Sequence, residues 1–141
     1  MTQRHPSLTL HVPGTIDAIR PATEQAESWL AERHVSFEAM YLASLTIEEL
    51  VTNCIKYGYD DPAGRTIDMM FSVEGQVLRI EVVDDGRPFN PLDAPAPDLS
   101  IPIEQRPIGG LGLHLLRELS DEAHYERRDG SNRLTLLKRM A

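Results

Sequence analysis

The chain has 141 residues, of which 41% are hydrophobic and 26% charged, and its formal net charge is −8 at pH 7. This length can bury one hydrophobic core, and an acidic excess without clustered Lys and Arg argues against direct nucleic-acid binding. No apolar run approaches the ~20 residues of a membrane span and residues 1–6 lack a signal-peptide core, so we expect a single cytoplasmic domain over residues 1–141 that contacts no membrane.

The first half of the chain predicts one strand and two helices. Residues 7–12 alternate as an edge strand, with Leu8, Leu10 and Val12 on the inner face. Residues 17–34 are expected to form a helix whose main segment starts at Pro21, because proline fits the first helical turn and not the interior. Residues 45–59 repeat apolar side chains with the period of an amphipathic helix.

The helix expected over residues 45–59 carries a polar face. At about 100° per residue, Glu49, Asn53 and Lys56 lie together, opposite a face on which the single cysteine, Cys54, is expected as a small buried hydrophobe. Glu49 and Asn53 are four residues apart, so a metal-bound phosphate could contact the amide oxygen while the carboxylate faces the attacking group. The alternative is a solvated helix face with a hydrogen bond from Glu to Asn.

A hairpin follows, with strands over residues 66–73 and 77–84 joined at Glu74 and Gly75. Asp84 continues the buried row of the second strand, where a carboxylate is costly unless something donates hydrogen bonds to it. An adenine amine is a suitable donor, and Gly86 lets the backbone approach the base closely. The alternative is a plain turn at residues 85–86, capped by Asp84 through nearby amides.

Residues 90–107 contain five prolines, and so long a segment inside a compact domain is either disordered or functional. Beside a nucleotide it indicates a lid, over about residues 90–108. A helix is then expected over residues 111–120. Its glycine-rich start, at Gly109, Gly110 and Gly112, offers unpaired amides and the positive end of the helix dipole to anions such as phosphates. The alternative is a tight loop.

The chain is expected to end in strands over residues 122–127 and 133–138, joined by a turn at residues 129–132. The predicted architecture is α/β: a two-layer sandwich in which three helices cover one face of a mixed, mostly antiparallel sheet. The five histidines do not cluster at ligand spacing, so we expect no histidine metal site.

Three motifs in this order resemble those of the GHKL ATPase superfamily, which has the Bergerat ATP-binding fold. Glu49 and Asn53 are similar to its N box, residues 84–89 to its adenine-binding G1 box, and residues 110–112 to its G2 box. Over about residues 8–139 the chain resembles the stand-alone anti-sigma serine/threonine kinases of the RsbW and SpoIIAB type. Those kinases commonly place histidine where this chain has Tyr57.

The resemblance implies an ATP- and Mg²⁺-dependent serine/threonine kinase that binds a sigma factor and phosphorylates an anti-anti-sigma protein of the STAS fold, with a homodimer possible. It implies that Glu49 accepts the substrate proton, that Asn53 holds Mg²⁺ and that Asp84 selects adenine. A binding module without transfer and a water-using ATPase remain alternatives; a histidine-kinase fragment is disfavoured because no phosphoacceptor helix pair precedes the domain. The nucleotide contacts implied are Asn53, Lys56, Asp84, Gly86, Phe89, Arg106 of the lid, Gly109, Gly110, Leu111, Gly112 and Leu113.

Overall fold

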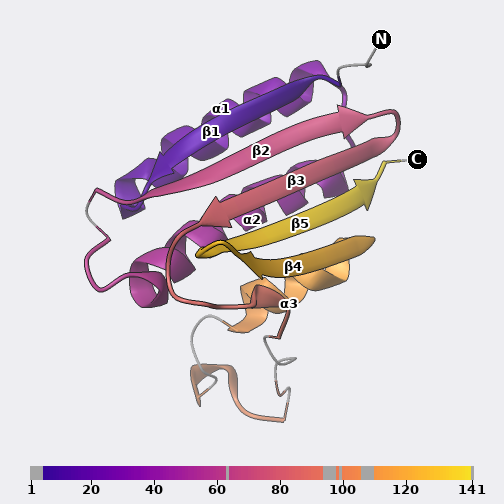
Figure 1. Ribbon diagram of the computed structural model, residues 1–141. Coiled ribbons are helices and arrows are strands. Elements are labelled where there is room, and N and C mark those ends of the chain that lie inside the picture. Colours follow the sequence, from indigo (N-terminus) through magenta and orange to yellow (C-terminus); the bar gives the residue numbers. More distant parts are fainter. Residues whose placement is uncertain (1–4, 63, 94–97, 99, 106–109, 141) are drawn as a thin grey trace.

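The computed structural model describes residues 5–62, 64–93, 98, 100–105 and 110–140, and it is built on one five-stranded sheet (Figure 1). The strand order is β1-β2-β3-β5-β4, and every pairing between these strands is antiparallel. The expected two-layer fold is therefore confirmed, with a sheet that is antiparallel throughout rather than mixed. The strands are β1 (Ser7–Pro13), β2 (Thr66–Glu74), β3 (Val77–Asp84), β4 (Glu122–Arg128) and β5 (Ser131–Arg139).

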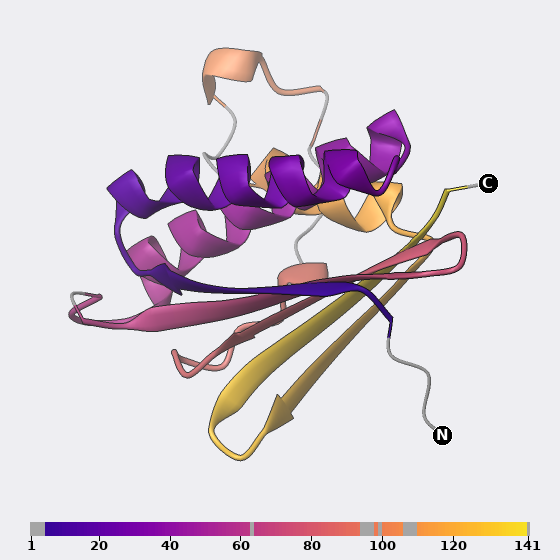
Figure 2. The same cartoon turned by 90° about the horizontal axis from the view of Figure 1, so that it is seen from above.

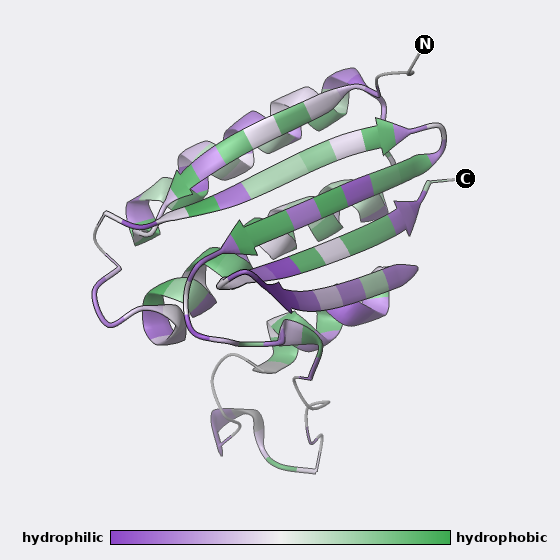
Figure 3. Ribbon diagram, viewed as in Figure 1, coloured by the Kyte–Doolittle hydropathy of each residue, from purple (hydrophilic) through white to green (hydrophobic). Residues whose placement is uncertain are grey.

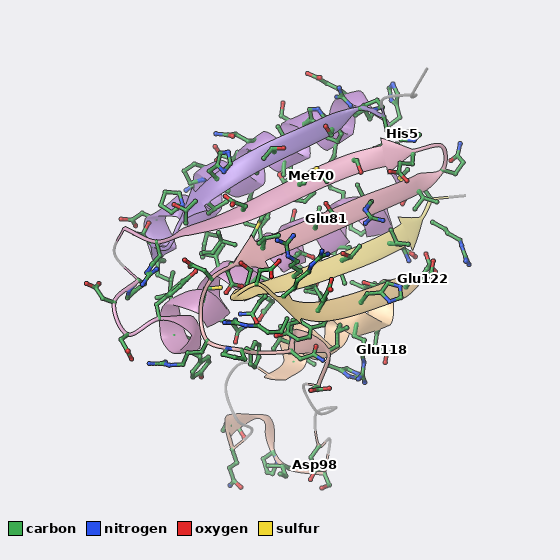
Figure 4. The ribbon with its side chains drawn as sticks, in the orientation of Figure 1. His5, Met70, Glu81, Asp98, Glu118 and Glu122 are labelled. Carbon is green, nitrogen blue, oxygen red and sulfur yellow. The ribbon has the colours of Figure 1, made fainter. Side chains whose placement is uncertain are left out.

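Three helices cover one face of the sheet: α1 (Ile19–Glu32), α2 (Phe37–Asn53) and α3 (Gly110–Leu119) (Figure 2). Side chains alternate along the strands, so that the ribbon changes repeatedly between hydrophobic and hydrophilic (Figure 3). The helix-facing rows, such as Leu78, Ile80 and Val82, form the core together with the apolar sides of α1 and α2. The other face of the sheet is open, and Met70 and Glu81 lie on it (Figure 4).

Helix α2 differs most from the expectation. It begins at Phe37, eight residues before the expected start, and the Ser36 hydroxyl caps it by accepting from the Ala39 amide at 3.2 Å. Its α-helical part ends at Asn53, and a π-helix (Cys54–Gly58) continues the chain. The expected single helix over residues 45–59 is thus the end of a longer α-helix followed by a widened turn.

The remaining elements are short. A 3₁₀ turn (Ile16–Ala18) leads into α1, which begins at Ile19, so Pro21 is the third residue of the helix rather than its first. Its missing N–H still falls in the first turn, where no helical partner exists. Two further 3₁₀ turns, Pro91–Asp93 and Ile103–Gln105, lie between β3 and α3. Asp98 and the second of these turns stand apart from the sheet and the helices (Figures 1 and 4).

The turn between β4 and β5 forms where it was expected. Asp129 and Gly130 both have positive φ, 51° and 77°, which suits a tight hairpin between twisted strands. This hairpin returns the chain so that β5 inserts between β3 and β4. Within the described part of the chain, no helix is long and apolar enough to cross a membrane.

Candidate functional site

A cavity opens between the end of α2, the π-helix and the adjoining ends of β3, β4 and β5. Its lining is largely apolar, with a carboxylate, two side-chain amides and a guanidinium among the apolar groups, which is the composition of a pocket for a flat aromatic ring. The residues lining it are Leu50, Asn53, Cys54, Tyr57, Gly58, Val82, Asp84, Arg87, Phe89, Pro91, Tyr125, Asn132 and Leu134.

Asp84 lies in this cavity as the last residue of β3 and is only 7% exposed. Its Oδ1 accepts hydrogen bonds from the Gly86 amide at 2.9 Å and from Asn132 Nδ2 at 3.0 Å. The turn-capping bond of the alternative interpretation is therefore present. The Cys54 thiol also hydrogen-bonds the Asp84 carboxylate. A carboxylate has about four acceptor sites, so Asp84 can still accept a hydrogen bond from a ligand.

Asn53 ends α2 at the edge of the cavity. Its Nδ2 donates to the backbone carbonyl of Glu49 at 2.6 Å. Since a carbonyl can only accept, this bond fixes which end of the amide is the nitrogen and directs Oδ1 away from the helix backbone. An exposed amide oxygen is a ligand that Mg²⁺ accepts.

Glu49 lies one turn earlier on α2 and faces the start of α3. A Cβ added to Gly112 would overlap the Glu49 carboxylate, so the absence of a side chain at Gly112 makes room for this group. Burial raises the pKa of the Glu49 carboxyl above its usual value of 4.5; the Glu48 carboxylate adds to the rise and Lys56 opposes it. A carboxylate with a raised pKa binds a proton more readily than an ordinary glutamate, which suits a group that accepts a proton from a substrate.

The loop after β3 is held tightly against the π-helix. The Arg87 amide donates to the Gly58 carbonyl at 2.9 Å, and the Arg87 guanidinium donates to the Tyr57 carbonyl at 3.0 Å and pairs with Asp60. A Cβ on Gly86 would come within 2.8 Å of the Gly58 oxygen. Glycine at residue 86 is therefore required by the close approach of two backbone segments, which fixes the wall of the cavity.

Asn132 is the functional residue that sequence reasoning missed. It pairs with Asp84 in the β3–β5 register and is 7% exposed. The sequence placed it in a turn one residue before the expected strand, whereas β5 begins at Ser131. The available signal was alternation, because Asn132 heads the row that continues with the buried Leu134 and Leu136.

The other predicted residues are distributed around the cavity and the start of α3. Phe89 lines the cavity, Lys56 is exposed on the π-helix, and Leu111 is exposed in the first turn of α3. Leu113 is 4% exposed and packs in the core, so its backbone rather than its side chain is available to a ligand. Gly110 is the first residue of α3. Arg106, Gly109 and much of the expected lid lie outside the described residues.

The donor set bears on the kind of metal that could bind. Among the described residues, no group of three or more His, Cys, Asp or Glu side chains is arranged to hold an ion. The oxygen of Asn53 is a hard ligand and a single one, which fits Mg²⁺ held mainly by phosphates and water.

Comparison with known proteins identifies a family and several relatives of this chain. The histidine kinase-like ATPase domain family matches residues 12–138. The serine/threonine-protein kinase BtrW of Bordetella bronchiseptica is 26% identical over 101 residues, covering 72% of this chain and 71% of its own. The anti-sigma F factor of Thermoanaerobacter sp. is 27% identical over 88 residues, 62% of this chain and 61% of that protein.

A solved structure agrees with the fold. The crystal structure of the RsbU and RsbW domains of a Mycobacterium tuberculosis protein superposes with a TM-score of 0.68 and 24% identity. The match covers 96% of this chain but 32% of that one, so the present chain spans about a third of that protein.

Proposed function

Since the chain belongs to the histidine kinase-like ATPase domain family, we propose that the cavity beside Asp84 binds the adenine of ATP. The observation that carries this proposal is a buried carboxylate in a largely apolar pocket. Such a carboxylate can accept from the exocyclic amine of adenine, while the apolar walls cover the ring. Guanine presents a carbonyl at the same position and is rejected because it would face Asp84 with a second acceptor.

The phosphates of ATP then extend toward α3. Its first turn, from Gly110 to Gly112, offers amides without helical partners, and the helix dipole favours negative charge there. Asn53 would hold Mg²⁺ through Oδ1, where a bound ion would supply positive charge beside the phosphates. Arg106 and Gly109, just before this helix, complete the proposed phosphate site.

We propose that the reaction is transfer of the terminal phosphate to a serine or threonine of a partner protein. Phosphoryl transfer depends mainly on positioning and charge stabilisation, and the group that accepts the hydroxyl proton in this chain is Glu49. Its raised pKa makes the carboxylate a better base than an ordinary glutamate. The relative from Bordetella, named a serine/threonine-protein kinase, supports this assignment.

The proposed biological role is that of an anti-sigma factor in a partner-switching system. The relative named anti-sigma F factor supports this part of the proposal. In this role the chain binds a sigma factor, and it phosphorylates a STAS-domain anti-anti-sigma protein. The net charge of −8 suits a partner that carries a basic surface.

The test is transfer of labelled phosphate from Mg-ATP to a candidate STAS-domain protein. Glu49→Gln should bind ATP as the parent does, because the base acts mainly in the transition state, and should transfer at least about tenfold more slowly. Glu48→Gln is the matched control, since Glu48 is exposed and adjacent; it should transfer at the parental rate at pH 8.

Other outcomes point to other functions. Label released as inorganic phosphate, with none on the partner, would indicate a water-using ATPase. Stable binding of ATP and partner without turnover would indicate a binding module. Equal transfer by Glu49→Gln and the parent would remove Glu49 from the mechanism.

A further inference from the structure

Asn132 makes hydrogen bonds with every donor and acceptor of its side-chain amide. Nδ2 donates to Asp84 Oδ1 at 3.0 Å and to the Arg87 carbonyl at 2.8 Å. Its Oδ1 accepts from the Phe89 amide at 3.2 Å and from the Tyr125 hydroxyl at 2.5 Å. Two donors and two lone pairs are the full capacity of an asparagine amide, so this buried group has no other orientation that keeps its bonds.

The orientation of the amide determines what Asp84 can do. An ionised carboxylate accepts hydrogen bonds and cannot donate, so the nitrogen of Asn132 must face it. Together with the Gly86 amide, this nitrogen engages Oδ1 twice, and these two bonds fix the orientation of the carboxylate that lines the cavity. The same amide holds the backbone at Arg87 and Phe89, which forms the adjoining wall.

We propose that Asn132 is a positioning residue that determines base specificity, by fixing the orientation in which the Asp84 carboxylate meets the nucleotide. The Tyr125 hydroxyl on β4 holds the Asn132 amide in turn. This inference rests on the proposed function, because it takes adenine to be the ligand that Asp84 reads. Asn132 need not contact the nucleotide for this role.

The other polar groups around this network are engaged elsewhere or stay neutral. Burial raises the pKa of the Cys54 thiol far above its usual range, with the Asp84 charge and a hydrogen bond to Asp84 as further causes, so the thiol stays protonated and donates to the Asp84 carboxylate. The Arg127 guanidinium donates to the Gly86 carbonyl at 2.7 Å. From the loop after β3, Asp85 pairs with Arg65 and accepts from Tyr59, and the Arg87 guanidinium is directed to Asp60 and Tyr57.

The decisive variant is Asn132→Asp, which keeps the size of the side chain. It replaces the donor facing Asp84 with a second carboxylate about 3 Å away, and two such groups cannot both ionise without strong repulsion. At low pH one shared proton restores the missing hydrogen bond. At high pH this proton is lost, and repulsion between the two carboxylates turns Asp84 away from residue 132. The Asp84 carboxylate then no longer accepts a hydrogen bond from the adenine amine.

The measurement is the ratio of dissociation constants for ITP and ATP between pH 6 and pH 8.5. ITP places a carbonyl where ATP has its amine, so the parent should prefer ATP by at least about tenfold throughout. In Asn132→Asp this preference should fall by at least about tenfold as the pH rises. A merely structural role would weaken both nucleotides equally and leave the ratio independent of pH.

Tyr125→Phe gives a second variant in case Asn132→Asp fails to fold. It removes one bond to Asn132 and should lower the ATP preference roughly two- to tenfold. Tyr59→Phe is its matched control, because it removes a tyrosine bond of 2.9 Å to the adjacent Asp85 without touching Asn132, and it should keep the parental ratio.

Each outcome has a defined meaning. An unchanged ratio in Tyr125→Phe, or a ratio in Asn132→Asp that does not vary with pH, overturns the role of Asn132 while leaving the proposed function intact. A parent that binds no ATP overturns the proposed function and this inference together. A parent that binds ITP and ATP equally shows that Asp84 does not read the base, and overturns the inference.

Discussion

Replacing Gly86 with alanine tests whether close backbone contact shapes the cavity. The new Cβ would lie 2.8 Å from the Gly58 oxygen, 3.2 Å from the Gly58 carbonyl carbon and 3.0 Å from Asp84 Oδ1. Two of these atoms are backbone and cannot swing aside, so the loop or the π-helix must shift. Overpacking of this kind costs about 1–3 kcal/mol in the free energy of unfolding. At roughly 4 °C per kcal/mol for a chain of this size, Tm should fall by about 4–12 °C.

The assay is urea denaturation of the parent, Gly86→Ala and Gly58→Ala, followed by titration with Mg-ATP. Gly58→Ala is the matched control on the other side of the same contact, because its Cβ would meet only Cys54 at 3.6 Å, an ordinary van der Waals distance. Gly86→Ala should lose both stability and ATP affinity, whereas Gly58→Ala should unfold at close to the parental urea concentration. Equal stability of Gly86→Ala and the parent would refute the reasoning.

Three further predictions concern the catalytic side of the site. In Gly112→Ala the new Cβ displaces only the flexible end of the Glu49 side chain. The Tm should therefore change by no more than a few degrees, while phosphate transfer slows about tenfold or more. Unchanged transfer would show that this position of the Glu49 carboxylate is not required. The rate of phosphate transfer should rise with pH as the Glu49 carboxyl, whose pKa is raised, loses its proton. The midpoint of this pH–rate profile should move to lower pH in Glu48→Gln and to higher pH in Lys56→Met. Midpoint shifts in the same direction for both variants would contradict the assigned charge effects. Asn53→Ala should weaken ATP binding in Mg²⁺ but not in EDTA, with little loss of stability, as calorimetric titration would show; equal weakening in both buffers would exclude a metal role.

Strand β3 could be predicted because its buried row alternates without interruption, as in Leu78, Ile80 and Val82. The start of α2 could not, because its first turns bury small side chains such as Ala39 and Ala43 and expose Phe37, which is 84% accessible. The largest apolar side chain of these turns therefore lies off the core face, which weakens the apolar pattern there. The π-helix depends on Arg87, which contacts Tyr57 and Gly58 from about thirty residues later in the sequence.

The residues of the candidate site fall into the same two groups, those that a local sequence pattern places and those that depend on contacts between distant parts of the chain. Glu49 and Asn53 are neighbours on one helix, and Asp84 ends a strand whose inner face is evident, so local periodicity placed them, while the resemblance to the GHKL motifs singled them out as site residues. Asn132 meets Asp84 only because β5 inserts between β3 and β4. That pairing joins residues 48 positions apart, and no local pattern specifies it. The place of Asn132 in the site is therefore set by the pairing of β3 with β5, which the local sequence pattern does not specify.

The central claim is that the cavity beside Asp84 binds adenine through a hydrogen bond to this carboxylate. Its most direct measurement is calorimetric competition between Mg-ATP and Mg-GTP on the parent and on Asp84→Asn. The parent should bind ATP and reject GTP. Asp84→Asn should lose about 1–3 kcal/mol of ATP binding free energy, roughly five- to 150-fold in affinity, because the charged acceptor is gone. If GTP displaces ATP from the parent at similar concentrations, or if Asp84→Asn binds ATP as the parent does, the claim is contradicted.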